Sequence, residues 1–376
     1  MIFSMRTFVL ALLALPLVAA GADTYTMNDF NSVPKIDAHM HLHSDASALM
    51  VLAHKDRFKL LTINVDYRDF PPVAQQQHVA AALHRDFPQD VAFAATISTD
   101  GFGKPGWSAT MLRQVDAAFA QGAVGIKLWK NIGMELRGAD GKLVMISDAR
   151  FEPLFNYLER NNKTLLGHQG EPKNCWLPLD QMTVNNDRAY FKAHPQYHMF
   201  LHPEMPSYEQ QMAARDTMLA KHPHMRFVGM HLASLEWDVD ELARFLDRNP
   251  DANVDVAARV GQLQYQSTRA REHVRQFFIK YQDRIMYGSD MAQSTEQSAA
   301  DFVAEVHKVW LKDWRYFNTA EMMTVSELDA PVQGLALPKP VVDKLFYLNA
   351  RKQYPQAWRR PGTPVAVAKV AQNTSR

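Results

Sequence analysis

Short runs of apolar, β-branched and aromatic residues recur along the chain. Between them lie segments whose apolar residues are spaced as on one face of a helix. This alternation predicts strands joined by helices, the pattern of a parallel sheet. The predicted strands cover residues 35–41, 58–65, 91–98, 123–129, 164–168, 226–231, 253–260 and 284–290. The predicted helices include residues 109–120, 151–160, 208–221, 239–247 and 269–281.

Eight strands are the number that closes a (β/α)8 barrel, so the predicted fold is an α/β TIM barrel. A doubly wound open sheet is the alternative. It is less favoured because no glycine-rich dinucleotide-binding sequence follows the first strand. We expect one barrel domain over residues 33–355, followed by a flexible tail over 360–376 that has no hydrophobic periodicity.

The connection after the fifth strand is too long for an ordinary loop between a strand and a helix. We therefore expect an ordered cap insertion over the barrel mouth at residues 170–206. Aromatic residues in the cap indicate an apolar or ring-bearing substrate, although packing within the cap would explain them equally well. These residues are Trp176, Tyr190, Phe191, Tyr197 and Phe200.

Residues 1–22 have the layout of a secretory signal peptide. One basic residue, Arg6, precedes an apolar stretch over 8–20, and small residues lie near Ala22. The apolar stretch is short for a transmembrane helix, so we expect export to the periplasm or the medium rather than an uncleaved membrane anchor. Cleavage would leave no membrane attachment. Because Cys175 is the one cysteine, an intramolecular disulfide is impossible.

The bulk composition narrows the range of partners. The 376 residues are 47% hydrophobic, which is enough to bury a large core. With 41 Lys and Arg against 40 Asp and Glu the net charge is +1, so nothing in the charge favours binding to nucleic acid or to an anionic membrane. The expected partner is a small-molecule substrate, and homo-oligomerisation is left open.

Candidate metal ligands stand at the carboxyl ends of four predicted strands, where a barrel builds its active site. His39 and His41 end the first strand and share a face because they are two residues apart. His168, His231 and Asp290 end the fifth, sixth and eighth strands. Any one histidine could be an ordinary hydrogen-bonded residue, and Asp290 could be a turn or capping residue. Together the five favour a metal site.

These motifs resemble those of the amidohydrolase superfamily, most closely its amidohydrolase-2 branch of hydrolases and decarboxylases. The resemblance runs over residues 33–354 and rests on Ile-Asp-Ala-His-Met-His at 36–41, the later strand-end histidines, Tyr-Gly-Ser-Asp at 287–290 and Leu-Asn-Ala-Arg at 348–351. It implies one divalent metal ion, Zn²⁺ before Mn²⁺, held by His39, His41 and His168. Asp290 would bind or flank the metal and act as the catalytic base. His231 would polarise the substrate or stabilise an oxyanion.

Three further residues are expected to bind substrate. Lys127, on the fourth strand, stands where binuclear members of the superfamily carry a carboxylated lysine that bridges two metals. We favour one metal and a non-ligating Lys127, because the amidohydrolase-2 branch is usually mononuclear. Arg259, on the seventh strand, suits a substrate carboxylate or carbonyl oxygen, or else a salt bridge. His202 in the cap, like Glu171 and Glu204, either faces the substrate or satisfies the cap's own backbone.

The predicted function is that of a metal-dependent hydrolase, which uses a metal-activated water on a C–N or C–O bond of a small molecule such as an amide, ester or lactone. The alternative is a metal-dependent, non-oxidative decarboxylase of an aromatic or unsaturated carboxylic acid. A barrel that binds a ligand without turnover is a third possibility, and the intact set of five residues disfavours it. Export would mildly favour hydrolysis of an external nutrient.

Overall fold

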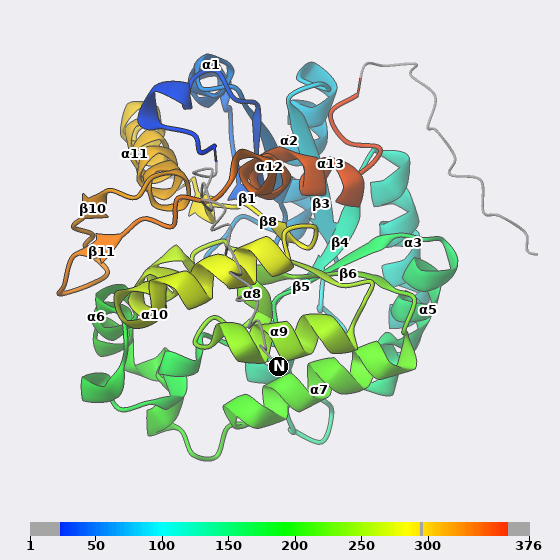
Figure 1. Cartoon of the computed structure of the whole chain (residues 1–376). Coiled ribbons are helices and arrows are strands. Elements are labelled where there is room, and N and C mark those ends of the chain that lie inside the picture. The colour runs from blue at the N-terminus through cyan, green and yellow to red at the C-terminus, as the bar shows by residue number, and fades with distance from the viewer. Residues whose placement is uncertain (1–22, 294–295, 360–376) are drawn as a thin grey trace, which may run out of the picture.

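The computed structural model describes residues 23–293 and 296–359 of the chain. The predicted signal peptide and C-terminal tail lie outside the described residues. Parallel strands form one curled sheet that is surrounded by helices (Figure 1). The strands follow the spatial order β8-β7-β6-β5-β4-β3-β2-β1-β9. Their bounds are β1 Lys35–His41, β2 Phe58–Ile63, β3 Val91–Thr96, β4 Gly125–Leu128, β5 Thr164–Gly167, β6 Arg226–Gly229, β7 Asn253–Asp255, β8 Ile285–Met286 and β9 Met291–Ala292.

The sheet closes where the last strands meet the first. β9 pairs in parallel with the end of β1. Just before β9, the Ala38 N–H donates to the carbonyl of Tyr287 (3.0 Å), and the Asp290 N–H donates to the carbonyl of His39 (2.8 Å). The predicted TIM barrel is therefore confirmed. The eighth strand is split in two at Gly288, where the backbone runs so close to β1 that a Cβ would lie 2.7 Å from the Cβ of His39.

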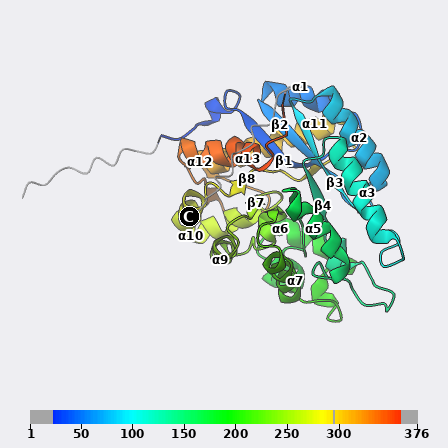
Figure 2. The same ribbon diagram turned by 90° about the vertical axis from the view of Figure 1, so that its right-hand side faces the viewer.

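Helices follow the strands along the outside of the barrel, and Figures 1 and 2 show α9 and α10 beside each other there. α7 occupies the predicted 208–221, since the capping box of Ser207 and Gln210 marks its start. α10 begins well before the predicted residue 269, because β7 stops early and the chain turns at Ala258 (φ +55°) into the helix. The main helices are α1 Ser47–Lys55, α2 Val73–Asp86, α3 Trp107–Ala120, α5 Glu152–Arg160, α7 Tyr208–Lys221, α9 Val239–Arg248, α10 Val260–Lys280 and α11 Ala299–Asn318.

Shorter elements complete the chain. A two-stranded antiparallel pair joins β10 Met322–Met323 to β11 Val332–Gln333. α4 Asn131–Met134 and α8 Met230–Ala233 follow β4 and β6, and α12 Lys339–Asp343 and α13 Asn349–Gln353 lie near the end of the described chain. None of the described helices is both long enough and apolar enough to span a membrane.

The barrel interior is a separate apolar core that the C-terminal segment closes at one end. Ile36 and Leu61 from the strands are buried together with Tyr354 and Trp358, which follow α13. The indole Nε1 of Trp358 donates to the carbonyl of Leu60 (2.9 Å), near the amino end of β2. The amino ends of the strands are therefore plugged, and the carboxyl ends form the mouth.

The long connection after β5 is ordered and has a small core of its own. It contains η3 Lys173–Trp176, η4 Leu179–Gln181, α6 Asn185–Ala193, η5 Pro195–Tyr197 and η6 Met199–Leu201. Cys175, Met182, Phe191 and Met199 are buried against one another within it. Asp187 of α6 accepts a hydrogen bond from Gln262 of α10 (2.9 Å), which ties the connection to the barrel. We call residues 170–206 the cap.

Candidate metal centre

The first strand turns both of its histidines into the barrel because its register shifts between Asp37 and Met40. Such a β-bulge changes the face to which the later side chains point. Before the bulge, Asp37 accepts a hydrogen bond from Nε1 of Trp310 on the outer helix α11 (2.8 Å). After it, Met40 packs in the outer core, and His39 and His41 face the barrel interior. The two histidines share a face, as their spacing predicts.

Three histidines are held in place through Nδ1, so each ring has Nε2 left for the histidine cluster. Nδ1 of His41 lies 2.7 Å from the carbonyl of Ile63, and Nδ1 of His231 lies 2.9 Å from the carbonyl of Ala257. Nδ1 of His39 lies 3.0 Å from Oδ2 of Asp255. Because carbonyl and carboxylate oxygens accept hydrogen bonds, Nδ1 of each ring carries a proton, and Nε2 is the atom that can bind a metal.

Four histidine rings and one carboxylate meet at the mouth. The ring centroids are 5.3 Å apart for His39 and His41, 4.8 Å for His39 and His231, and 4.1 Å for His168 and His231. Oδ1 of Asp290 lies 3.1 Å from Nε2 of His39 and 3.2 Å from Nε2 of His41. The fold thus brings together all five predicted residues of the metal site, from both ends of the sequence.

This donor set fits a divalent metal ion. Nε2 of His168 is buried without a hydrogen-bond partner among the described residues, which costs free energy unless something binds it. His39, His41 and Asp290 also bring one ligand atom each within 4.8 Å of one another. Imidazole nitrogen with carboxylate oxygen is a donor combination suited to zinc or manganese.

Burial and the facing ionisable groups together control the protonation of the cluster. It lowers the pKa of His168 and of His231 well below the ordinary value, so both rings are neutral, as metal ligands must be. Burial acts to raise the pKa of Asp290, but the facing imidazoles of His231, His39 and His41 hold that pKa well below its usual range. Asp290 is therefore ionised, and its side chain is 28% exposed, so solvent reaches it.

The segment that carries His231 is a left-handed turn rather than the end of a strand. β6 stops at Gly229, and the φ angles of residues 231–234 are +56°, +58°, +56° and +57°. Such angles cost about 1–2 kcal/mol per residue, so other contacts must hold the turn. Asp255 Oδ1 accepts the His231 N–H (2.7 Å), and the Tyr208 hydroxyl donates to the carbonyl of Ser234 (2.5 Å).

Two of the predicted substrate-binding residues are buried at the same end of the barrel. Lys127 is on β4, its Nζ has no partner among the described atoms, and burial lowers its pKa to about 8 despite the carboxylates of Asp255 and Asp290. The prediction that Arg259 lies on a strand is wrong, because β7 ends at Asp255 and Arg259 caps α10. Arg259 is buried, and its Nη1 donates to the carbonyl of Ala258 (3.1 Å).

The cap residue His202 is engaged within the cap. Its Nε2 lies 3.0 Å from the carbonyl of Pro195, and its Nδ1 lies 3.6 Å from Glu204. Both ring nitrogens therefore have partners in the cap rather than in the histidine cluster. Glu171, which follows β5, instead forms an ion pair with Lys130, which follows β4.

The loop between β2 and α2, residues 64–72, lies across part of the mouth, and we call it the mouth loop. The ring of Phe70 lies 5.3 Å from that of His41 and 4.3 Å from that of His43. Arg68 donates a hydrogen bond to the hydroxyl of Tyr197 in the cap. The mouth loop therefore covers His41 of the metal site and connects the barrel to the cap.

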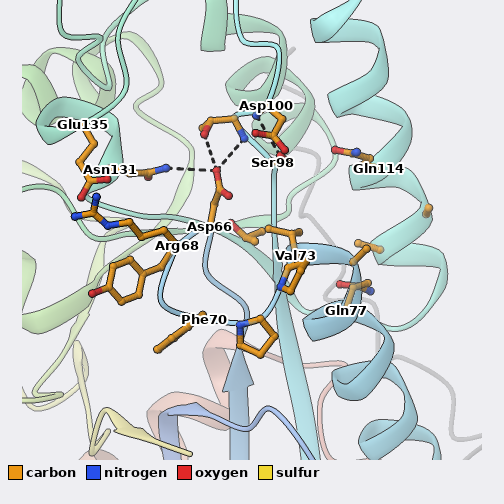
Figure 3. A pocket seen from close by; sticks show the side chains of 18 of the residues that line it. Asp66, Arg68, Phe70, Val73, Gln77, Ser98, Asp100, Gln114, Asn131 and Glu135 are labelled. Carbon is orange, nitrogen blue, oxygen red and sulfur yellow. Dashed lines mark hydrogen bonds between the residues drawn. The ribbon is translucent and has the colours of Figure 1, made fainter. Parts of the chain in front are cut away.

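Two cavities flank the mouth loop. The larger, of about 800 Å³, extends between α2 and α3 (Figure 3). In it Asp66 accepts hydrogen bonds from the N–H and hydroxyl of Thr99 (2.9 and 2.6 Å) and from Asn131 (3.4 Å), so it joins the loops after β2, β3 and β4. The second cavity, of about 650 Å³, lies on the cap side. Its apolar wall includes Tyr67, Trp129, Met134, Tyr190, Tyr197 and Met199.

Residues that the sequence interpretation missed complete the site. Asp255 contacts two histidines, and Phe70 covers a third. Asp255 left a signal, because a charged residue inside a wholly buried parallel strand needs a partner. Phe70 had no such signal in the sequence, because a loop sequence does not show which ring a phenylalanine in the loop will cover.

The closed barrel and the histidine cluster place this chain among the (β/α)8 proteins that have a candidate metal site at the carboxyl ends of the strands. The family model described as Amidohydrolase matches residues 36–356, and the chain belongs to this family. This confirms the resemblance inferred from the motifs. No curated protein matches the chain in sequence.

Solved structures are similar to this chain at low sequence identity. The 2,6-dihydroxybenzoate decarboxylase from Rhizobium is similar over 86% of this chain and 99% of its own, with 10% identity and a TM-score of 0.50. The 4-oxalomesaconate hydratase from Rhodopseudomonas palustris is similar over 86% of this chain and 96% of its own, with 11% identity and a TM-score of 0.44. At 10% identity the likeness to the decarboxylase shows the fold alone.

Proposed function

We propose that this protein is a metal-dependent hydrolase that cleaves a C–N or C–O bond in a small molecule such as an amide, ester or lactone. The carboxylate of Asp290 carries the proposal. It lies 3.1 Å from Nε2 of His39 and 3.2 Å from Nε2 of His41, it is ionised, and solvent reaches it. A carboxylate in this position is suited to take a proton from an attacking water.

The roles of the chain's own groups follow from their positions. Nε2 atoms of His39, His41 and His168 would hold the ion. A divalent ion bound there would supply Lewis acidity and lower the pKa of nearby water. Asp290 takes the proton of the attacking water on its carboxylate and delivers it to the departing nitrogen or oxygen, which closes the proton balance of the hydrolysis.

Lys127 is chemically better suited than His231 to stabilise negative charge on the attacked oxygen. Nδ1 of His231 donates to the carbonyl of Ala257, so its neutral ring presents only a lone pair at Nε2. That lone pair suits a metal or a proton. Lys127 brings an ammonium with no protein partner among the described atoms, and a preorganised cation stabilises a developing oxyanion.

The cap-side cavity offers a binding surface for the rest of the substrate. Its volume of about 650 Å³ is that of a pocket for a small organic molecule. The rings of Tyr67 and Trp129 are 4.4 Å apart on one side of it, and the parallel rings of Tyr190 and Tyr197 are 6.5 Å apart on the cap side. Such walls favour a flat or ring-bearing substrate.

Lys127 also supports a second candidate, the decarboxylation of an aromatic or unsaturated acid. Its buried ammonium could pair with the carboxylate that leaves. The two reactions differ in their products, because hydrolysis adds one water and decarboxylation releases CO₂.

A product analysis tests the proposal. The full-length protein, loaded with Zn²⁺ or Mn²⁺, is incubated with ring-bearing amides, esters, lactones and carboxylic acids in H₂¹⁸O, and products are measured by mass spectrometry. We expect one ¹⁸O atom in the acid product of an amide, ester or lactone. Release of CO₂ with no ¹⁸O in the remaining organic product would show that the protein is a decarboxylase and not a hydrolase.

Paired variants connect any activity to the site. Asp290→Asn should lower turnover by about 10²–10⁴-fold, while Asp313→Asn should retain it. Asp313 is also an aspartate and is deeply buried, but it lies on α11 and accepts a hydrogen bond from Tyr287. Equal turnover in the two variants would refute the assigned base.

A further inference from the structure

We propose that Asp255 is a positioning residue that sets two groups of the metal centre at once: it fixes the tautomer of His39 and holds the strained turn that carries His231. The inference rests on the metal centre proposed above. Oδ2 of Asp255 lies 3.0 Å from Nδ1 of His39, and Oδ1 lies 2.7 Å from the backbone nitrogen of His231. Oδ1 also accepts the Ala257 N–H at 3.3 Å.

The placement of Asp255 explains how its charge is tolerated. Its side chain is 1% exposed on the short strand β7, and a buried carboxylate is costly unless donors surround it. Three N–H groups supply this compensation, one from an imidazole and two from the backbone. Lys127 adds a cation within electrostatic reach.

The contact with His39 decides which nitrogen of that ring faces the other ligands. A carboxylate can only accept, so Nδ1 of His39 carries a proton toward Asp255, and Nε2 is the ring atom left to serve a metal. Nε2 is the atom that faces Asp290, beside Nε2 of His41. A carboxylate behind a metal-binding histidine orients the ring and raises its basicity, and removing such a partner commonly costs about 10–100-fold in metal affinity.

The contact with His231 acts on the backbone. Four consecutive residues with positive φ begin at His231, and its N–H is directed to Oδ1 of Asp255. Because the same carboxylate also holds His39, the two rings are kept at a centroid distance of 4.8 Å by one side chain. Asp255 therefore couples the first strand of the barrel to the turn after the sixth.

An asparagine at this position would have the same shape but could satisfy only one of the two contacts. With its carbonyl oxygen toward the N–H of His231, its amide would donate to Nδ1 of His39 and force the proton onto Nε2. With the amide reversed, two donors would face each other at His231. Asp255→Asn is thus a nearly isosteric test of the acceptor role.

The alternative is that Asp255 is a metal ligand, since one of its oxygens lies within 4.8 Å of a ligand atom of His39 and of His231. Ligation from that side would need Nδ1 of His39 without its proton. In the structure both oxygens of Asp255 already accept N–H donors, which favours the positioning role.

The first test measures metal binding of full-length protein by competition with a chelator, for wild type, Asp255→Asn and the matched variant Asp313→Asn. We expect zinc to bind about 10–100-fold more weakly to Asp255→Asn and within about twofold of wild type to Asp313→Asn. The melting temperatures of the metal-free proteins show whether each variant is folded. Unchanged zinc affinity in folded Asp255→Asn overturns the proposal.

The Co²⁺ absorption spectrum separates positioning from ligation. With positioning, Co²⁺-loaded Asp255→Asn at saturating metal keeps the band intensities of the wild type, because the number of ligands is unchanged. A spectrum that reports a lower coordination number would make Asp255 a ligand and overturn the positioning role.

A second test needs no variant at Asp255. Histidine-selective ¹⁵N NMR of metal-free wild type should show His39 protonated on Nδ1, with the signal assigned by its loss in His39→Gln. His222, held between Glu159 and Glu152 at 3.0 Å each, provides a reference away from the site. A proton on Nε2 of His39 alone would refute the tautomer assignment. If wild type bound no metal, the proposed function would fail while this tautomer result still stood.

Discussion

Oδ1 of Asp290 lies 3.2 Å from Nε2 of His41, although 249 positions separate the two residues in the chain. The contact crosses the seam where the barrel closes, and the backbone supports it, because the Asp290 N–H donates to the carbonyl of His39 (2.8 Å). Asp290 has a φ of +65°, so its carboxylate is held by an unusual local conformation. The catalytic base that we propose is therefore fixed by the closure of the fold.

Replacing Asp290 by asparagine removes the proton acceptor and keeps the shape. We expect kcat to fall by about 10²–10⁴-fold, the usual contribution of a general base. Steady-state kinetics on the best substrate of the product screen measure the change, with circular dichroism to verify the fold. A variant within a few-fold of wild type would show that another group takes the proton.

Lys127→Met tests the ammonium in the cluster. We expect kcat/KM to fall at least about tenfold, because the ammonium proposed to stabilise the developing oxyanion is lost. Metal content, measured by inductively coupled plasma mass spectrometry, should stay at one equivalent. Loss of a second equivalent would show instead that Lys127 bridges two ions. The control is Lys163→Met, because Lys163 precedes the amino end of β5, at the end of the barrel opposite the mouth.

Removing the metal should lower both activity and stability. A ligand at 1,000 times its Kd stabilises the folded state by about 4 kcal/mol, so chelation should lower the melting temperature by several degrees. Zn²⁺ or Mn²⁺ should restore both properties. Mg²⁺ should not, because a site rich in imidazole suits it poorly. Full activity after complete chelation would contradict the proposed function.

Glu236 should make the stability pH-dependent. Burial raises the pKa of Glu236 from its ordinary 4.5 to about 7, so the folded state holds this proton more tightly than the unfolded state. The stability therefore falls as the pH rises from 4.5 through 7, by about 3 kcal/mol. Glu236→Gln removes this loss. The stability of the variant relative to wild type should therefore be higher at pH 8 than at pH 5.

Denaturant unfolding of the two proteins at several pH values measures this difference. Glu209→Gln, at an exposed position on α7, is the matched control. Its stability difference from wild type should not change with pH in this way. A constant difference between Glu236→Gln and wild type across the pH range would contradict the prediction.

The exposed Ala258 should tolerate glycine because its φ is +55°. Glycine adopts this conformation without the steric cost of a Cβ, which is about 1–2 kcal/mol. Ala213→Gly, at an exposed position inside α7, should instead lose about 1 kcal/mol. We expect Ala258→Gly to melt at or above the wild-type temperature and Ala213→Gly to melt below it. The reverse order would contradict the prediction.

The regular elements could be predicted because their signals are local. The predicted segment 208–221 coincides with α7, whose capping box stands in the sequence. The predicted strands near β6, β7 and β8 were too long. β6 ends at Gly229, which leads into a left-handed turn, and Ala258 turns the chain toward α10. At Gly288 the backbone runs close to His39, where a Cβ would not fit. These breaks depend on neighbours that come from other parts of the chain.

The sequence by itself determined the type of barrel and the five residues at its mouth. Strand periodicity is a local property, and the carboxyl ends of parallel strands always meet at one end of the sheet. Only the tertiary structure decided how these residues work together. Asp255 lies 216 positions from His39, and its role exists only because two strands place them 3.0 Å apart. Tautomers, strained turns and covering rings are set by such contacts, which no local pattern records.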